Sequence, residues 1–135
     1  MKIFLDSSVL VESGLSQSSK FQKADALVGR SNAVTSAHAL SEAYATLSGD
    51  SRLNIRPADA NRMVRDLAKT ITVFALSSDN YLQLISSAPT NGIRGGGIYD
   101  ALHAETARLC GCQEIHTLNV AHFKHVAPDL KIQGL

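Results

Sequence analysis

Short apolar runs alternate with helix-like segments along this chain, and this alternation restricts the fold more than any other feature. The strand-sized runs are Ile3–Leu5, Ala33–Ser36, residues 71–76, residues 115–118 and Lys131–Gln133. The first run is continuously apolar, as in strands that are buried on both faces. Strands that alternate with helices indicate βαβ units, so we predict an α/β fold with a central, mainly parallel sheet of four to five strands.

The segments between these runs have helical periodicity. Pro57 suits the first turn of a helix, and Gly111 suits the position just after the end of one. The apolar stripe at residues 37–47 follows the i, i+3, i+4, i+7 pattern of a helix and consists of Leu40, Ala43, Tyr44 and Leu47. The predicted helices cover Phe21–Val28, residues 37–47, a segment from Pro57, a segment through residue 88 that is capped by Ser78 or Asp79, residues 98–111 and residues 120–125.

The composition is that of a globular protein. With 135 residues, 44% of them apolar, the chain is large enough for one domain with a sizeable core. We expect Cys110 and Cys112 to be free, partly buried thiols in a reducing compartment. The first apolar run stops at Asp6 and no apolar stretch reaches transmembrane length, so we expect a cytoplasmic protein without membrane association.

The charge is nearly balanced, with a formal net charge of +1, so no overall basic field attracts nucleic acid. One stretch is locally basic and contains Arg52, Arg56, Arg62 and Arg65, with three aspartates among them. This stretch either contacts a nucleic acid or is a solvated helix face with ion pairs at i, i+3 and i, i+4.

Two aspartates occupy the ends of predicted elements. Asp6 directly follows the first strand, and ligands of parallel α/β sheets bind at the carboxyl ends of strands. Alternatively, Asp6 caps a possible helix that begins at Ser7 and Ser8. Asp100 lies in the first turn of a helix that follows three glycines, where the helix dipole also favours a carboxylate by about 0.3–1 kcal/mol. Each aspartate therefore has a functional and a structural interpretation.

Two glutamates and two histidines lie on the same predicted helices. Glu42 is directed away from the apolar stripe of its helix, so it lies under a cleft or on a solvated face. Glu105 falls on an apolar stripe, where an unpaired carboxylate is costly. We therefore interpret Glu105 as an acid that supports a site or as a residue at the edge of the stripe. For His38 and His103 we expect structural hydrogen bonds rather than contact with a substrate.

Four segments resemble the PIN-domain family, and specifically the VapC-type toxins of toxin–antitoxin pairs. They are MKIFLDSSVL at residues 1–10, TSAHALSEAYATL at 35–47, GGIYDALHA at 96–104 and IHTLN at 115–119 with Phe123 after it. Their order and spacing match the family over almost the whole chain. The resemblance implies a PIN-like three-layer α/β/α sandwich, with residues 1–135 in a single domain.

The resemblance also implies an active site. It assigns Asp6, Glu42 and Asp100 as catalytic acids that bind metal. The family often has a fourth acid two residues after the threonine that ends its fourth strand, and this catalytic position is Asn119 here. Other members have an aspartate just before the following phenylalanine, where this chain has His122. Asn119 offers a carbonyl oxygen to a metal or its water, but no charge.

Three carboxylates in one crevice repel one another and raise one another's pKa values, and a hard cation relieves this repulsion. Oxygen ligands select Mg²⁺, or Mn²⁺ as a substitute, over zinc. We expect Asp6 and Asp100 to bind the metal directly and Glu42 to complete the site or orient a water. Ser8 and Thr117 are expected to hydrogen-bond the carboxylates and hold their orientation.

The activity implied by the resemblance is that of a metal-dependent endoribonuclease, a hydrolase of RNA phosphodiester bonds and the toxin of a toxin–antitoxin pair. The implied partners are RNA, a cognate antitoxin protein and a second copy in a homodimer. Asn119 motivates an alternative, a non-catalytic PIN-like module that binds RNA or protein. A phosphatase with an aspartate on its first strand is a weaker alternative, because that chemistry needs a second aspartate where this chain has Ser8.

Overall fold

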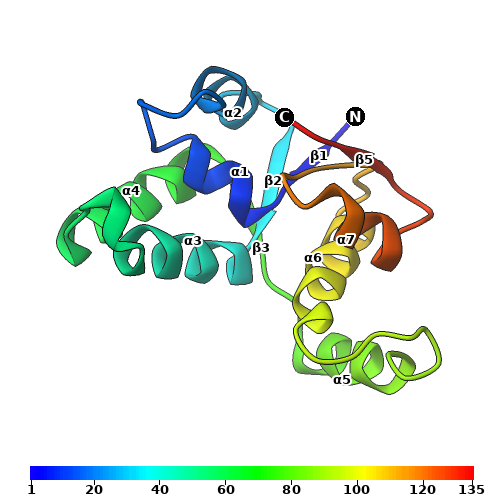
Figure 1. The fold of residues 1–135 in the computed structure, drawn as a ribbon. Helices are drawn as coiled ribbons and strands as arrows, with labels where there is room; N and C mark the ends of the chain where they lie inside the picture. Colours follow the sequence, from blue (N-terminus) through cyan, green and yellow to red (C-terminus); the bar gives the residue numbers. More distant parts are fainter.

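The computed structural model describes residues 1–135 and contains a five-stranded sheet in which all neighbouring strands are parallel (Figure 1). The strand order is β3-β2-β1-β4-β5, so β1 lies at the centre. The strands are β1 Ile3–Leu5, β2 Ala33–Ser36, β3 Thr72–Phe74, β4 Glu114–His116 and β5 Lys131–Gln133. The predicted α/β fold with a parallel sheet is therefore confirmed.

Seven α-helices and one short 3₁₀ helix connect or flank these strands. They are α1 Ser7–Glu12, α2 Phe21–Val28, α3 Ala37–Gly49, the 3₁₀ helix Ser51–Leu53, α4 Pro57–Thr70, α5 Ser78–Ser87, α6 Gly97–Leu109 and α7 Val120–Val126. The helix α4 begins at Pro57 as predicted. The predicted cap of α5 was wrong, because Ser77 caps this helix in a reciprocal capping box with Asn80. None of these helices has the length and apolar composition required to cross a membrane.

Helices cover both faces of the sheet, which gives the expected three layers. Successive side chains of a strand point to opposite faces, so Ile3 and Leu5 pack in one apolar cluster and Phe4 packs in another. The first cluster includes residues of α1, α2, α3 and α4, and the second includes residues of α6 and α7. Figure 1 shows α1, α3 and α4 on one side of the strands and α6 and α7 on the other.

The helix α3 packs through smaller residues than its sequence pattern suggested. Its buried residues are Ala39, Ala43 and Leu47, whereas Tyr44 is 41% exposed. These buried side chains join the same apolar cluster as Val9, Leu10 and Val11 of α1, whereas the large side chain of Tyr44 remains partly in solvent. Cys110 and Cys112 are free and buried, as expected.

The core position of Leu47 leads to a prediction about stability. Leu47 is 1% exposed, so Leu47→Ala leaves a cavity and is expected to lower the free energy of unfolding by about 2–5 kcal/mol. Leu82→Ala is the matched control, because Leu82 is 62% exposed and its loss should change stability by less than about 0.5 kcal/mol. Denaturant unfolding measures both changes, and equal effects would contradict the packing described here.

Candidate active site

Asp6 is a buried carboxylate at the end of the central strand. It occupies the N-cap position of α1, yet its side chain makes no capping hydrogen bond. Ser8 and Thr117 instead donate hydrogen bonds to its Oδ2 atom, each at 2.8 Å. Its Oδ1 atom accepts only a long hydrogen bond of 3.4 Å from Ser7. The capping interpretation is therefore wrong for this side chain, and Oδ1 retains capacity for a further ligand.

Glu42 extends from α3 toward His103 of α6. Its Oε1 atom lies 2.5 Å from Nε2 of His103, and its Oε2 atom lies 3.8 Å from Nε2 of His38. His103 is completely buried, and its Nδ1 atom lies 2.9 Å from the hydroxyl of Ser36 at the end of β2. The expected structural hydrogen bond of His103 is confirmed. The interpretation of Glu42 as a residue on a solvated helix face is wrong, because its side chain is only 31% exposed and is paired with His103.

These contacts determine the ionisation of Glu42. Burial acts to raise its pKa, but the hydrogen bond and charge of His103 act in the opposite direction, together with the charge of His38 and a hydrogen bond from Ser7. The net result is a pKa below the usual value of a glutamate. Glu42 is therefore held in its charged form by imidazoles.

Asp100 has the opposite shift. It lies in the first turn of α6, where burial raises its pKa and the negative charges of Asp6 and Glu42 raise it further. The charges of His103 and His122 oppose this shift without cancelling it, although Nδ1 of His122 is only 3.6 Å from Oδ2 of Asp100. The structure thus brings the three predicted acids within electrostatic range of one another at the carboxyl edge of the sheet.

The oxygen atoms of Asp6 and Asp100 fit a hard divalent cation. Asp6 has one carboxylate oxygen with capacity for a ligand, and Asp100 is partly buried beside other negative charges that a cation would neutralise. Mg²⁺ and Mn²⁺ prefer such oxygen ligands. Glu42 fits direct binding less well, because each of its oxygens lies near an imidazole nitrogen.

The segment after β4 is attached to the same hydroxyl groups that hold Asp6. The backbone N–H of Asn119 donates to Oγ1 of Thr117 at 2.9 Å, and the N–H of Leu118 donates to Oγ of Ser8 at 3.0 Å. The Asn119 side chain is exposed and does not cap α7. Asn119 is therefore held close to Asp6 through Thr117, with its side-chain amide exposed.

Glu105, interpreted from the sequence as a supporting acid or as a residue at the edge of the stripe, makes its ion pair with Arg108. Its carboxylate pairs with Arg108 at 3.3 Å, and Arg108 also binds Asp129 at 2.8 Å. Glu105 comes five residues after Asp100 on α6 and is thus rotated by about 140° around the helix axis. It belongs to an ion-pair network with Arg108 and Asp129.

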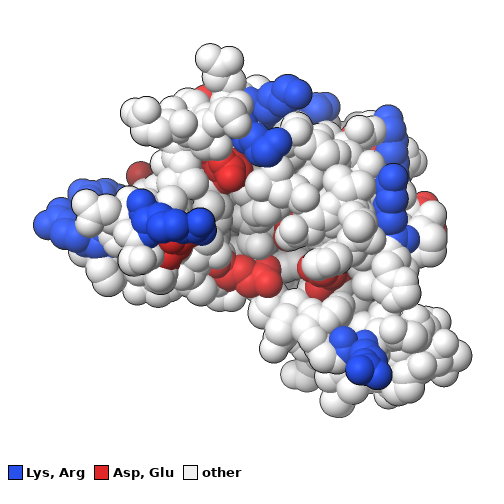
Figure 2. Space-filling view, viewed as in Figure 1, with Lys and Arg blue, Asp and Glu red and all other residues white.

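Most of the predicted basic stretch is neutralised locally. Arg52 pairs with Asp50, and both Arg56 and Arg62 pair with Asp59. The predicted ion pairs at i, i+3 are therefore present for Arg56 and Arg62, whereas Arg52 pairs with an aspartate two residues away. Figure 2 shows two groups of acidic atoms between α3 and α6, with Lys and Arg atoms gathered around the edges of this face rather than beside them.

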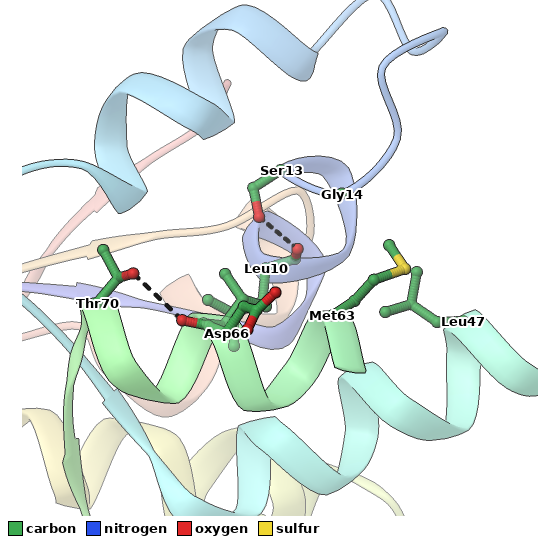
Figure 3. Close-up of a pocket in the computed structure, with 8 residues that line it drawn as sticks. Leu10, Ser13, Gly14, Leu47, Met63, Asp66 and Thr70 are labelled. Carbon is green, nitrogen blue, oxygen red and sulfur yellow. Dashed lines mark hydrogen bonds between the residues drawn. The ribbon is translucent and has the colours of Figure 1, made fainter. Parts of the chain in front are cut away.

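A separate groove lies between α1, α3 and α4 (Figure 3). Its lining is mainly apolar and consists of Leu10, Ser13, Gly14, Leu47, Met63, Asp66, Leu67 and Thr70. None of the residues predicted for the active site lines this groove. The acids at the carboxyl edge of the sheet therefore remain the candidate active site.

A parallel α/β sandwich with acids at the carboxyl edge of its sheet defines the class of protein. Residues 3–128 match the family model described as PIN domain. The chain belongs to the PIN domain family. No curated protein sequence matches it significantly.

Solved structures of VapC toxins and their complexes share the fold. A chain of the DNA-bound VapBC complex from Salmonella typhimurium is 18% identical, with a TM-score of 0.72 over 99% of this chain and 98% of that chain. VapBC2 from Rickettsia felis is 17% identical, with a TM-score of 0.70 over 100% and 99%. VapC20 from Mycobacterium tuberculosis, a sarcin–ricin loop cleaving toxin, is 20% identical, with a TM-score of 0.66 over 84% and 87%.

The raised pKa of Asp100, caused by burial and by neighbouring negative charges, predicts that its replacement stabilises the metal-free protein. Folding raises the pKa of Asp100 above the usual value of 3.8, so its charge opposes folding increasingly as the pH rises through the folded-state pKa. Asp100→Asn should therefore raise Tm at pH 7, and this gain should shrink at pH values below 3.8. Thermal unfolding in EDTA measures the change in Tm, and a lower Tm of Asp100→Asn at pH 7 would contradict a destabilising charge at Asp100.

Glu42→Gln is the matched variant, for which we expect a change in Tm of the opposite sign. Folding lowers the pKa of Glu42, so its charge stabilises the fold above the usual value of 4.5, and this contribution is lost as the pH falls through the folded-state pKa. We expect Glu42→Gln to lower Tm at pH 7 and to have less effect at acidic pH. The same thermal unfolding series tests both signs.

Proposed function

We propose that this protein is a metal-dependent endoribonuclease that hydrolyses RNA phosphodiester bonds, as the toxin of a toxin–antitoxin pair. The observation that carries the proposal is the position of Asp6, Glu42 and Asp100 at one edge of the sheet, where burial and the negative charges of Asp6 and Glu42 raise the pKa of Asp100. Membership of the PIN domain family supports it. The shared fold of VapC20, a sarcin–ricin loop cleaving toxin, supports the choice of RNA.

Each residue has a proposed part in the reaction. Asp6 and Asp100 would hold Mg²⁺, or Mn²⁺ in its place, which supplies Lewis-acid activation of the phosphate and of water when bound. Ser8 and Thr117 keep the Asp6 carboxylate in one orientation through Oδ2, so that Oδ1 is presented for binding. Glu42, held charged by His103, would orient the attacking water. The amide of Asn119 would bind the metal's water without adding charge.

The proposal extends to the working form of the protein. We propose that residues 1–135 act as a single domain, that two copies form a homodimer, and that an antitoxin protein binds and inhibits the toxin. Complexes of VapC-like chains with antitoxins, such as the VapBC assembly from Salmonella typhimurium, support the antitoxin partner. An RNA substrate implies that the protein acts in the cytoplasm.

One observation favours a second candidate function. Asn119, in place of a fourth acid, is exposed and uncharged, which weakens any metal site that depends on it. A descendant that no longer binds metal would remain a PIN-like module that binds RNA or protein. The nuclease remains the first proposal, because the charges of Asp6 and Glu42 are both present beside Asp100.

Cleavage of labelled structured RNA tests the proposal. We expect the antitoxin-free protein to cut RNA with Mg²⁺ or Mn²⁺ and to lose this activity in EDTA. Asp100→Asn removes a proposed metal ligand and should reduce the rate by at least about 10²–10³-fold. Because this variant is expected to be more stable than wild type, loss of activity would not reflect unfolding.

Glu105→Gln is the matched control on the same helix. Glu105 is paired with Arg108 at 3.3 Å and lies outside the acidic group, so this variant should cut RNA at nearly the wild-type rate. Absence of cleavage by folded wild-type protein with both metals would refute the nuclease and favour the binding module. Full activity of Asp100→Asn would refute the proposed site.

A further inference from the structure

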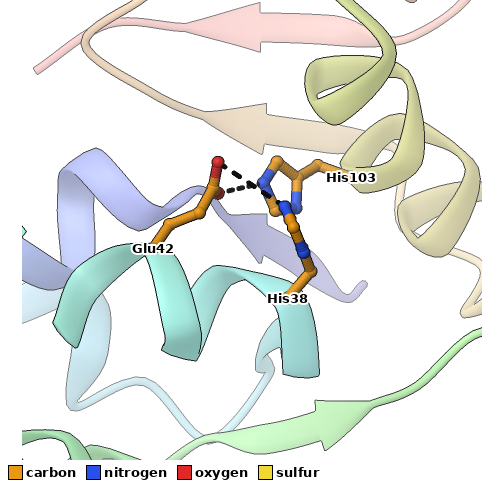
Figure 4. Close-up of side chains that lie close together, drawn as sticks. All are labelled: His38, Glu42 and His103. Atoms are coloured by element: carbon orange, nitrogen blue, oxygen red, sulfur yellow. Dashed lines mark hydrogen bonds and ion pairs between the residues drawn. The ribbon is translucent and has the colours of Figure 1, made fainter. Parts of the chain in front are cut away.

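Three side chains of residue types that bind metals gather beside the carboxylates of Asp6 and Asp100. His38 and Glu42 lie one helical turn apart on α3, and His103 faces them from α6 (Figure 4). One ligand atom from each of these three residues lies within 4.8 Å of the other two. The combination of two imidazoles and one carboxylate differs in chemistry from the carboxylate group already described.

The distances suit a small ion with nitrogen ligands. Zinc bonds of 2.0–2.1 Å in a tetrahedral site place ligand atoms about 3.3 Å from one another. The two observed contacts of Glu42 are made by different oxygens, 2.5 Å from Oε1 to His103 and 3.8 Å from Oε2 to His38, and the two distances lie on either side of this value. Small rotations of the Glu42 and His38 side chains, both partly exposed, would bring the three ligands into place.

His103 has the support that a metal-binding histidine requires. Such a histidine usually donates its second ring N–H to a fixed acceptor, which sets the tautomer and the ring orientation. The Nδ1 atom of His103 lies 2.9 Å from the Ser36 hydroxyl, whose oxygen also accepts the backbone N–H of Ala39 at 2.9 Å. The ring of His38 is oriented by stacking on Tyr99, at a centroid distance of 5.4 Å and an interplanar angle of 20°.

We propose that His38, Glu42 and His103 form a zinc site, and that zinc bound there inhibits RNA cleavage because it takes Glu42 from the carboxylate group. Imidazole nitrogen favours Zn²⁺, whereas Mg²⁺ takes oxygen ligands. Three protein ligands leave a fourth position open for water. The zinc site stands on its own geometry, whereas the inhibition rests on the proposed ribonuclease function.

Cobalt titration of the metal-free protein tests the site without any activity measurement. Tetrahedral Co²⁺ with nitrogen and oxygen ligands absorbs visible light much more strongly than octahedral Co²⁺ in water. We expect these bands to saturate at one Co²⁺ per chain and to disappear when Zn²⁺ is added. His38→Ala should weaken Co²⁺ binding at least about tenfold.

His125→Ala is the control, because His125 is an exposed histidine of α7 outside the cluster. It should bind Co²⁺ as tightly as wild type, and circular dichroism establishes that both variants are folded. The proposal is overturned if wild type develops no tetrahedral bands, or if His38→Ala retains wild-type affinity.

A second experiment tests the zinc site independently of the proposed ribonuclease function. Asp100→Asn should keep the Co²⁺ bands although it loses the proposed cleavage. For His38→Ala, the ratio of cleavage rates with and without added Zn²⁺ should approach one, whereas wild type should be inhibited. Equal zinc inhibition of both proteins would overturn the regulatory inference. Absence of all cleavage would refute the proposed function while the cobalt result still decides the site.

Discussion

Burial of the Asp6 carboxylate imposes a cost that its neighbours must offset, because an ionised group loses its hydration in the protein interior. Ser8, from the first turn of α1, and Thr117, after β4, both donate to one oxygen of this carboxylate. The same hydroxyls accept backbone N–H groups of the segment that leads into α7. Through these hydrogen bonds, one buried carboxylate at the end of β1 connects the start of α1 with the segment after β4 and fixes the position of Asn119.

The rest of the site consists of an oxygen-rich part and a nitrogen-rich part. Burial and the charge of Asp6 raise the pKa of Asp100, whereas the contact with His103 outweighs burial at Glu42 and lowers the pKa of that carboxylate. The two parts meet at His103, whose Nε2 atom is also 4.0 Å from Oδ1 of Asp6. This division underlies the proposal that one small crevice offers one set of ligands to hard cations and another to softer ones.

Local sequence patterns predicted most elements because their signals are short-range. The run Ile3–Leu5 ends at a charged residue, and Pro57 suits the first turn of a helix, so β1 and the start of α4 were found correctly. Errors occurred where local pattern and packing disagree. Tyr44 fitted the apolar stripe of α3 but is 41% exposed, and Ser77 rather than Ser78 caps α5. Glu105 fitted a stripe, yet it pairs with Arg108.

The sequence by itself determined that Asp6 ends a buried strand, that Asp100 begins a helix, and that a parallel sheet brings such ends to one edge. Only the tertiary structure decided which groups meet there. His103 lies three residues from Asp100, but its imidazole ring is hydrogen-bonded to Glu42, which is 61 residues away in the chain. Long-range pairs of this kind depend on how α3 and α6 are placed around the sheet, and no local spacing contains that information.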